Sequence, residues 1–185
     1  MSVILIDDGD AGFAAAGWLV SSDPSFGQGD CRYIPAGAIT PAVYNFGALG
    51  AGSAVVELQW GANANRATNV AWQVKAGAAV LDSGTVNQQE WPASGGAGTF
   101  RTVATVNILA GEAITVAIVP GTNGYTVADQ CRVTFTPSEP PQPPGSGISL
   151  QAVLDKIEAD YQAALGAAAE QRQFSIQWAN EAVGS

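Results

Sequence analysis

Hydrophobic and polar residues alternate in short runs along residues 1–136 of the chain. A period of two places successive side chains on opposite faces of an extended strand, so these runs predict half-buried β-strands. In the run 54–60, the pattern predicts one face made of Val56, Leu58 and Trp60, and an opposite face made of Val55, Glu57 and Gln59.

Similar runs recur along this part of the chain and are bounded by Gly, Pro, Asn and Asp, which favour turns. Many short strands at such spacing are typical of an antiparallel sandwich. We therefore expect residues 1–136 to form an all-β antiparallel sandwich or jelly roll, with a hairpin turning at 110–112. The predicted strands are 2–6, 16–20, 30–34, 41–47, 53–60, 69–76, 78–82, 99–108, 112–119 and 125–136.

A proline-rich segment, 137–148, follows the predicted sandwich. Proline cannot continue a sheet or a helix, and closely spaced prolines favour the extended polyproline II conformation. We expect a semi-rigid linker here. Residues 149–185 then predict one amphipathic helix, with Ser149 as its N-cap.

Large apolar side chains of this helix recur at intervals of three and four residues, which gathers them on one stripe. A solitary amphipathic helix is only marginally stable in water, so we expect something to cover the stripe. Three arrangements remain open: self-association, with a trimer favoured; docking to another protein; and folding back onto the sandwich. The predicted oligomer seam consists of Leu150, Val153, Leu154, Ile157, Tyr161 and Leu165.

The net charge of −9 argues against nucleic acid and against an anionic membrane surface as partners. No apolar run reaches the length needed to span a bilayer, so membrane insertion is not expected. The segment 1–8 lacks both the basic start and the long apolar run of a signal peptide. We therefore expect synthesis in the cytoplasm without a secretory leader.

The chain contains no histidine and no Gly-x-Ser-x-Gly motif, which excludes a histidine-based triad and leaves no hydrolase elbow. No pair of glutamates suggests a glycosidase, so we do not expect an enzyme. Its two cysteines, Cys31 and Cys131, lie in predicted strands. They form either a disulfide that closes a long loop or two buried free thiols.

Four aspartates offer hard oxygen ligands: Asp7, Asp8 and Asp10 lie close together, and Asp129 lies near the end of the sandwich. Because the first and last strands of a jelly roll often pair, Asp129 can join the others. Carboxylates at short spacing suit calcium, whereas Asp-Gly is equally a turn signature. A structural calcium ion is the one cofactor that the sequence suggests.

Four segments in order resemble the C-terminal domain of golvesin and its relatives in xanthan lyases, which are carbohydrate-binding-like β-sandwiches. The first is Ile4–Phe13, similar to an opening Asp-Asn/Asp-x-x-x-Gly-Phe motif. The second runs from Ala54 to Asn69 and ends in Asn-Arg-Ala-Thr-Asn. The third is Gly84–Gln88 followed by Trp91, and the fourth is Val127–Val133.

The resemblance implies a galactose-binding-like sandwich that serves as an accessory module and binds polysaccharide. Sugars bind through aromatic side chains against their apolar faces and through polar side chains that reach their hydroxyls. We predict Trp91 and Tyr125 as exposed aromatics, and Trp18, Trp60 and Trp72 as core. The alternative is that the polar residues only satisfy turn backbone. The predicted glycan contacts are Asn63, Asn65, Arg66, Asn69, Gln88, Trp91 and Tyr125.

The Ala- and Gln-rich helix, with Gln177-Trp178-Ala179-Asn180 near its end, resembles segments of phage tail-fibre and virion proteins. This resemblance implies a head spike, fibre or decoration protein on the surface of a phage or a phage-like particle such as a gene transfer agent. Its expected partners are cell-surface polysaccharide, other virion proteins and further copies of the chain. The alternatives are an architectural decoration protein without a ligand and a bacterial accessory carbohydrate-binding module.

Overall fold

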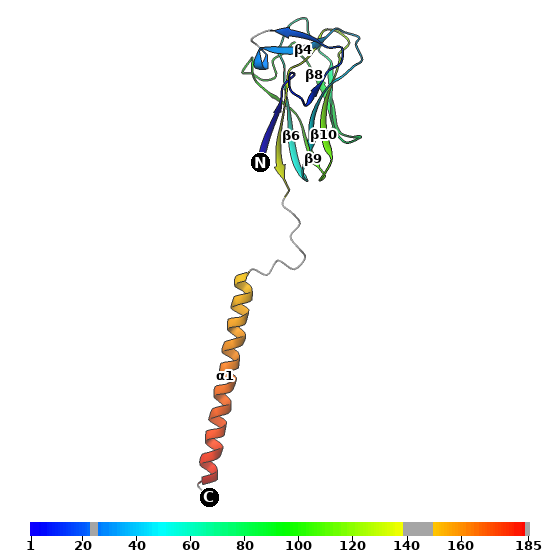
Figure 1. Cartoon of the computed structure of the whole chain (residues 1–185). Coiled ribbons are helices and arrows are strands. Elements are labelled where there is room, and N and C mark those ends of the chain that lie inside the picture. Colours follow the sequence, from blue (N-terminus) through cyan, green and yellow to red (C-terminus); the bar gives the residue numbers. More distant parts are fainter. Residues whose placement is uncertain (23–25, 139–149, 184–185) are drawn as a thin grey trace. The chain divides into compact units, whose positions relative to one another are not determined.

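The computed structural model describes residues 1–22, 26–138 and 150–183, with the side chains of the last range described for 150–166 and Arg172. The chain divides into two compact units, Met1–Glu139 and Pro140–Ser185. The first unit, called the β-domain below, consists almost entirely of strands and loops, and the second contains one helix (Figure 1).

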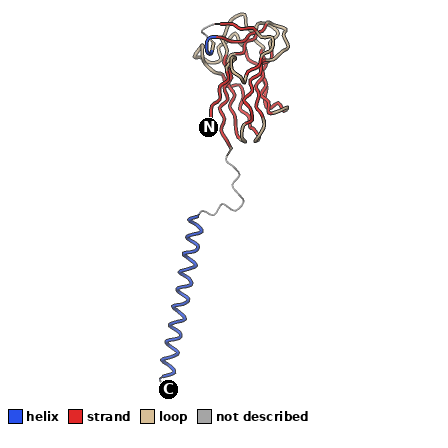
Figure 2. The backbone as a smooth tube through the Cα atoms, viewed as in Figure 1, coloured by secondary structure: helices blue, strands red, loops and turns tan. Residues whose placement is uncertain are grey.

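The alternating runs of the sequence form twelve strands in the described part of the β-domain, drawn in red in Figure 2. Each of the ten predicted strands overlaps an observed strand or a pair of strands. Their ends agree within three residues, except that the observed strand continues four residues beyond the predicted end of 78–82. The bounds are β1 Ser2–Ile6, β2 Phe13–Ala14, β3 Leu19–Ser22, β4 Asp30–Ile34, β5 Ala42–Ala48, β6 Gly52–Gln59, β7 Val70–Ala76, β8 Ala79–Val86, β9 Arg101–Ile108, β10 Ala113–Val119, β11 Thr126–Ala128 and β12 Gln130–Pro137.

The strands form three antiparallel sheets, which confirms the all-β sandwich that the sequence predicts. One sheet has the order β1-β12-β6-β9, and a second has the order β2-β5-β10-β7-β8. A smaller sheet, β11-β4-β3, lies at the end of the β-domain opposite to the end from which β12 leaves (Figure 1).

The core lies between the two larger sheets. Alternate residues of β6 are buried, including Val56 and Leu58, and the buried Trp60 follows the strand directly. The predicted core indoles of Trp18, Trp60 and Trp72 are all at most 7% exposed. The period-two pattern therefore assigned the inward face of β6 correctly. Gln59, expected to face outward, is also buried, because its side chain contacts a buried carboxylate described below.

Three local expectations need correction. The chain does turn at 110–112, but β9 and β10 do not form a hairpin, because β9 pairs with β6 while β10 pairs with β5 and β7. The predicted strand 125–136 is interrupted at Asp129, so that β11 and β12 belong to different sheets. The short strand β2 lies outside the predicted set.

Helix α1 runs from Leu150 to Val183. The six predicted seam residues are all between 41% and 77% exposed. Among the described residues, no helix combines the length and apolarity needed to cross a membrane. Of the predicted linker 137–148, Pro137 belongs to β12, whereas 139–148 and the predicted cap Ser149 lie outside the described residues.

Candidate functional site

A polar hollow opens between the small sheet and two loops, the 63–69 loop before β7 and the 121–125 loop before β11. Its volume is about 270 Å³. Three of the predicted glycan contacts meet here, although they come from separate parts of the chain. The lining residues of this site, called the Arg66 hollow below, are Ser21, Tyr33, Asn65, Arg66 and Tyr125.

Two reciprocal side-chain pairs fasten the two loops together. Asn69 Nδ2 donates to Thr122 Oγ1 at 2.8 Å, and the Thr122 N–H donates back to Asn69 Oδ1 at 3.1 Å. The Thr68 N–H donates to Asn123 Oδ1 at 3.0 Å, and Asn123 Nδ2 donates to Thr68 Oγ1 at 2.7 Å. The Asn69 amide, predicted to contact a glycan, therefore has both of its polar atoms occupied by the neighbouring loop.

Backbone contacts set the distance between the loops at the hollow itself. The Tyr125 N–H donates to the Asn65 carbonyl at 3.0 Å, and the Ala67 N–H donates to the Tyr125 carbonyl at 2.8 Å. These two bonds enclose Arg66, which forms a bridge with Tyr125. A Cβ on Gly124 would lie only 2.6 Å from the Arg66 carbonyl group, so this close approach requires glycine.

The hollow combines aromatic rings with one cationic group. The Tyr33 and Tyr125 rings meet edge to face with centroids 5.9 Å apart, and Tyr125 is 40% exposed. The Arg66 guanidinium carbon lies 5.9 Å from the centre of the Phe26 ring. Its Nε is buried and has no hydrogen-bond partner within the described chain. The site therefore offers an exposed aromatic surface beside an incompletely satisfied guanidinium.

The remaining predicted glycan contacts lie outside this lining. Gln88 is buried, and its amide forms two hydrogen bonds with the backbone of Val127, so it supports the fold. Asn63 is exposed, and its Oδ1 accepts the backbone N–H of Asn65 within a turn. Trp91 is exposed, as predicted, but it does not line the hollow.

Two lining residues, Ser21 and Tyr33, are absent from the predicted set. Tyr33 lies in a correctly predicted strand, where a single tyrosine is indistinguishable from core. Ser21 lies just beyond the predicted strand 16–20. The pairing of β3 with β4 brings Ser21 opposite Cys31 and Leu19 opposite Tyr33. Only this pairing, which is not visible in a periodicity pattern, places both residues beside the loops.

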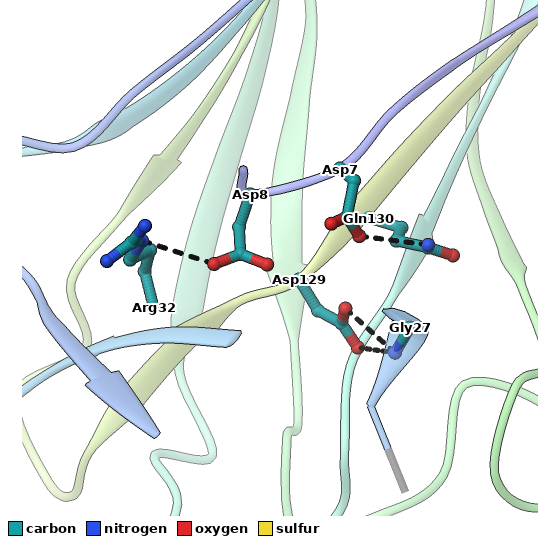
Figure 3. A network of polar contacts seen from close by, with 6 residues as sticks. All are labelled: Asp7, Asp8, Gly27, Arg32, Asp129 and Gln130. Carbon is teal, nitrogen blue, oxygen red and sulfur yellow. Dashed lines mark hydrogen bonds and ion pairs between the residues drawn. The ribbon is translucent and has the colours of Figure 1, made fainter. Parts of the chain in front are cut away.

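A second polar site lies where β1 ends and β12 begins (Figure 3). Asp7, Asp8 and Asp129 each place a carboxylate oxygen within 4.8 Å of the others, and all three are buried. The antiparallel pairing of β1 with β12 produces this meeting, as expected from the sequence. Asp8 Oδ1 has no hydrogen-bond partner in the described chain, and Asp8 Oδ2 lies 3.1 Å from Arg32 Nε without forming an aligned hydrogen bond.

The other two carboxylates accept hydrogen bonds. The Gly27 N–H donates to both Asp129 oxygens, at 3.0 and 3.1 Å, and Gln59 Nε2 lies 3.4 Å from Asp129 Oδ2. Gln130 Nε2 donates to Asp7 Oδ1 at 2.9 Å (Figure 3). These neutral donors orient the carboxylates but do not neutralise their charge.

Burial raises the pKa of all three carboxyl groups because it penalises their charged forms. The pKa of Asp129 rises to about 8, opposed in part by the Gly27 hydrogen bond. The pKa of Asp8 rises to about 6, and the negative charges of Asp30 and Asp7 add to the effect of burial. The raised pKa values mean that the three carboxyl groups resist being ionised together at neutral pH.

The fourth predicted ligand, Asp10, does not join this cluster. Asp10 is exposed, and its Oδ2 accepts the Asp7 backbone N–H at 2.9 Å. A backbone bond from the Asp10 N–H to the Asp7 carbonyl closes the same turn. For Asp10, the turn alternative is the one that the structure supports.

The two cysteines are buried free thiols, so the second of the two predicted alternatives describes the structure. Burial raises the pKa of Cys31 to about 12, and it raises the pKa of Cys131 well above its usual value. Both thiols therefore stay protonated at neutral pH and behave as small apolar core residues.

Solved structures of other proteins share the fold of the β-domain. No family model matches the chain, and no curated protein matches it. A Paenibacillus xanthan lyase structure superposes with a TM-score of 0.61 at 24% identity, covering 73% of this chain and 13% of the lyase. The CBM35 module of Cellvibrio japonicus Abf62 superposes with a TM-score of 0.54 at 15% identity, covering 74% of this chain and 95% of the module.

A third structure is the CBM36-1 domain of a multidomain xylanase from the hindgut metagenome of Trinervitermes trinervoides. It superposes with a TM-score of 0.51 at 12% identity, and the superposition covers 74% of this chain and 100% of that domain. The β-domain thus has the β-sandwich fold of these modules. It corresponds to only a small part of the xanthan lyase, so these likenesses concern the fold and not the activity of the larger protein.

Proposed function

We propose that the β-domain binds polysaccharide and that the Arg66 hollow is its binding site. The observation that carries the proposal is the meeting of Asn65, Arg66 and Tyr125 in one polar hollow beside Tyr33. A sugar ring packs its apolar face on an exposed aromatic ring, while its hydroxyls need nearby amide and guanidinium groups. The likeness of the fold to carbohydrate-binding modules supports the same function.

The helix supplies the second part of the proposal, which is self-association. Leu154, Ile157 and Tyr161 follow the alternating four- and three-residue spacing of a coiled-coil seam, and all three are exposed. A seam of this kind is complementary to a second copy of itself. Several β-domains held together would bind a repeating polymer with an avidity far above the affinity of one hollow.

The setting that we propose is the surface of a phage or phage-like particle, where the β-domain grips host polysaccharide and the helix assembles or anchors the protein beside other virion proteins. Its support is the layout of a binding domain and a separate helix. A bacterial accessory module has the same binding chemistry without a particle. An architectural decoration protein would bind no ligand in the Arg66 hollow.

The binding proposal is tested with the full-length chain on immobilised polysaccharides, measured beside a variant that cannot self-associate. Leu154→Glu with Ile157→Glu places two charges on the stripe, and Glu158→Gln with Asp155→Asn changes the off-stripe face as the matched control. We expect saturable binding by the wild-type chain, at least tenfold weaker binding by the stripe variant, and unchanged binding by the control. Absence of saturable binding across a broad panel of polysaccharides would refute the function.

We further propose that Asp7, Asp8 and Asp129 hold a calcium ion that stabilises the β-domain. Three carboxylates and the Arg32 guanidinium sum to a charge of −2 when ionised, which one divalent cation balances. Calcium prefers oxygen ligands of this kind. The buried, unpartnered Asp8 Oδ1 is the observation that favours the ion, because an ionised oxygen without a partner is costly inside a protein.

A further inference from the structure

Arg66 is the half-buried arginine of the β-domain that lacks an acidic partner in the described chain. Arg32 lies 3.1 Å from Asp8, and Arg132 lies 2.7 Å from Glu57. Among the described residues, no carboxylate lines the hollow beside Arg66, whose guanidinium carbon lies 5.9 Å from the centre of the Phe26 ring. A guanidinium has five N–H donors, and leaving donors unsatisfied in a partly buried place is unfavourable.

We propose that the Arg66 hollow selects a sugar that carries a carboxylate, such as a uronic acid residue, over the corresponding neutral sugar. This inference rests on the proposed polysaccharide function and names its ligand class. The planar carboxylate matches the guanidinium fork and accepts two parallel hydrogen bonds. The same contact would supply the acceptor that Arg66 lacks.

The rest of the hollow suits the remainder of such a sugar. The exposed Tyr125 ring, fixed by its edge-to-face contact with Tyr33, offers an apolar surface next to the guanidinium. Ser21 and Asn65 line the same hollow with a hydroxyl and an amide, which pair with sugar hydroxyls. A volume of about 270 Å³ lies just below the usual range of small-molecule pockets, which suits one sugar unit better than a long oligomer.

The net charge of −9 does not oppose this selection at physiological salt. The Debye length there is about 8 Å, so exposed charges further away are largely screened. A direct contact between a partly buried guanidinium and a carboxylate is screened much less. Local pairing at Arg66 therefore outweighs the overall acidity of the chain.

The test compares the full-length protein on polygalacturonate and on the same polymer after complete methyl esterification, which removes the charge and keeps the backbone. Dextran sulfate and dextran form a second pair that separates carboxylate from sulfate. Arg66→Gln removes the charge, and Arg66→Lys keeps the charge but loses the fork. Arg101→Gln makes the same charge change at an exposed position on β9. Thermal unfolding confirms that each variant is folded.

We expect the wild-type chain to bind polygalacturonate at least tenfold more tightly than its ester, a difference of about 1.4 kcal/mol. Arg66→Gln should abolish this preference, Arg66→Lys should weaken it, and Arg101→Gln should preserve it. Equal binding of acid and ester, unaffected by Arg66→Gln, would overturn the inference and leave the polysaccharide function standing. If the wild-type chain binds dextran sulfate as tightly as polygalacturonate, or more tightly, selection for a carboxylate over a sulfate is overturned. Failure to bind any polymer would overturn both proposals.

Discussion

The side chain of Gln88 is paired with the backbone of Val127 through two hydrogen bonds. Gln88 Nε2 donates to the Val127 carbonyl at 2.8 Å, and the Val127 N–H donates to Gln88 Oε1 at 2.9 Å. Both residues are at most 3% exposed. The Gln88 side-chain amide thus forms the hydrogen bonds that a neighbouring strand would otherwise form with Val127 of β11. It fixes the segment that directly follows Tyr125.

Replacing Gln88 by Leu should destabilise the β-domain. The substitution leaves the buried N–H and carbonyl of Val127 without partners, and each such loss costs about 1–3 kcal/mol. We expect the free energy of unfolding, measured by guanidinium denaturation, to fall by at least about 1 kcal/mol. Gln73→Leu on β7 is the control, since Gln73 is half-buried and its side chain forms no hydrogen bond within the described residues. Equal effects of the two substitutions would contradict the role given to Gln88.

Gly124→Ala should separate the two loops that form the Arg66 hollow. The added Cβ would meet backbone atoms of Arg66 at 2.6 Å and of Ala67 at 2.8 Å, and neither can move as a flexible side chain does. Overpacking of this kind costs about 1–3 kcal/mol. We expect a lower melting temperature together with weaker polysaccharide binding, measured on the same preparation.

Gly50→Ala is the matched control, because its added Cβ would meet only the Phe135 ring at 3.8 Å, an ordinary van der Waals distance. This variant should melt and bind like the wild-type protein. A Gly124→Ala variant that keeps full binding would show that the hollow does not depend on the close approach of the loops.

The sequence predicts those features of the structure that depend on residues close together in the chain or on the fold class. The alternation in 54–60 is local, and it identifies the buried face of β6 and the core position of Trp60. The pairing of β1 with β12 follows from a general property of jelly rolls, and it brings Asp129 to Asp7 and Asp8 as predicted. Both predictions rest on information that is present in a short segment or in the fold class.

The hollow required contacts that no local pattern contains. Asn65, Arg66 and Tyr125 were predicted, but Tyr33 joins them through strand pairings, with β3 on one side and with β11 on the other, where Tyr33 lies opposite Val127. Gln88 was predicted as a glycan contact from the resemblance of its segment to a known family, but its side chain is buried. Gln88 is buried because its amide forms hydrogen bonds with the backbone N–H and carbonyl of Val127. These two groups come next to Gln88 only in the folded chain.

Calcium should raise the melting temperature of the wild-type protein relative to the same protein in EDTA. A ligand that binds only the folded state at a hundred times its dissociation constant stabilises by about 2.7 kcal/mol. Asp129→Asn and Asp8→Asn each remove one negative ligand while keeping side-chain size, and each should reduce the calcium-dependent shift. Asp82→Asn, on β8 and outside the cluster, should leave it unchanged. Magnesium provides a further control, because it demands a stricter octahedral geometry. An identical melting temperature with calcium and with EDTA would exclude the ion.

Without calcium, the β-domain should lose stability as the pH rises from about 4 to about 8. The folded-state pKa values of Asp8, about 6, and of Asp129, about 8, lie above the usual value of an aspartate, so the folded protein binds more protons than the unfolded chain in this range. Their contribution is complete below the unfolded pKa and disappears as the pH passes through the folded values. We expect a higher melting temperature in EDTA at pH 5.5 than at pH 8.5, and a smaller difference for Asp129→Asn. Calcium should reduce the difference, because it binds the deprotonated cluster. A melting temperature in EDTA that rises over this interval would reject the assignment.

Helix α1 should determine the oligomeric state of the protein. Leu154 and Ile157 are 51% and 59% exposed, and burying apolar surface yields about 25 cal/mol per Å², so self-association removes a continuous stripe from water. Sedimentation equilibrium of the full-length chain should show an assembly, with a trimer as our expectation, and Leu154→Glu with Ile157→Glu should convert it to a monomer. Asp155→Asn with Glu158→Gln should leave the mass unchanged, since these side chains lie off the stripe. A wild-type chain that sediments as a monomer over a wide concentration range would reject self-association and leave docking to a different protein or folding back onto the β-domain as the alternatives.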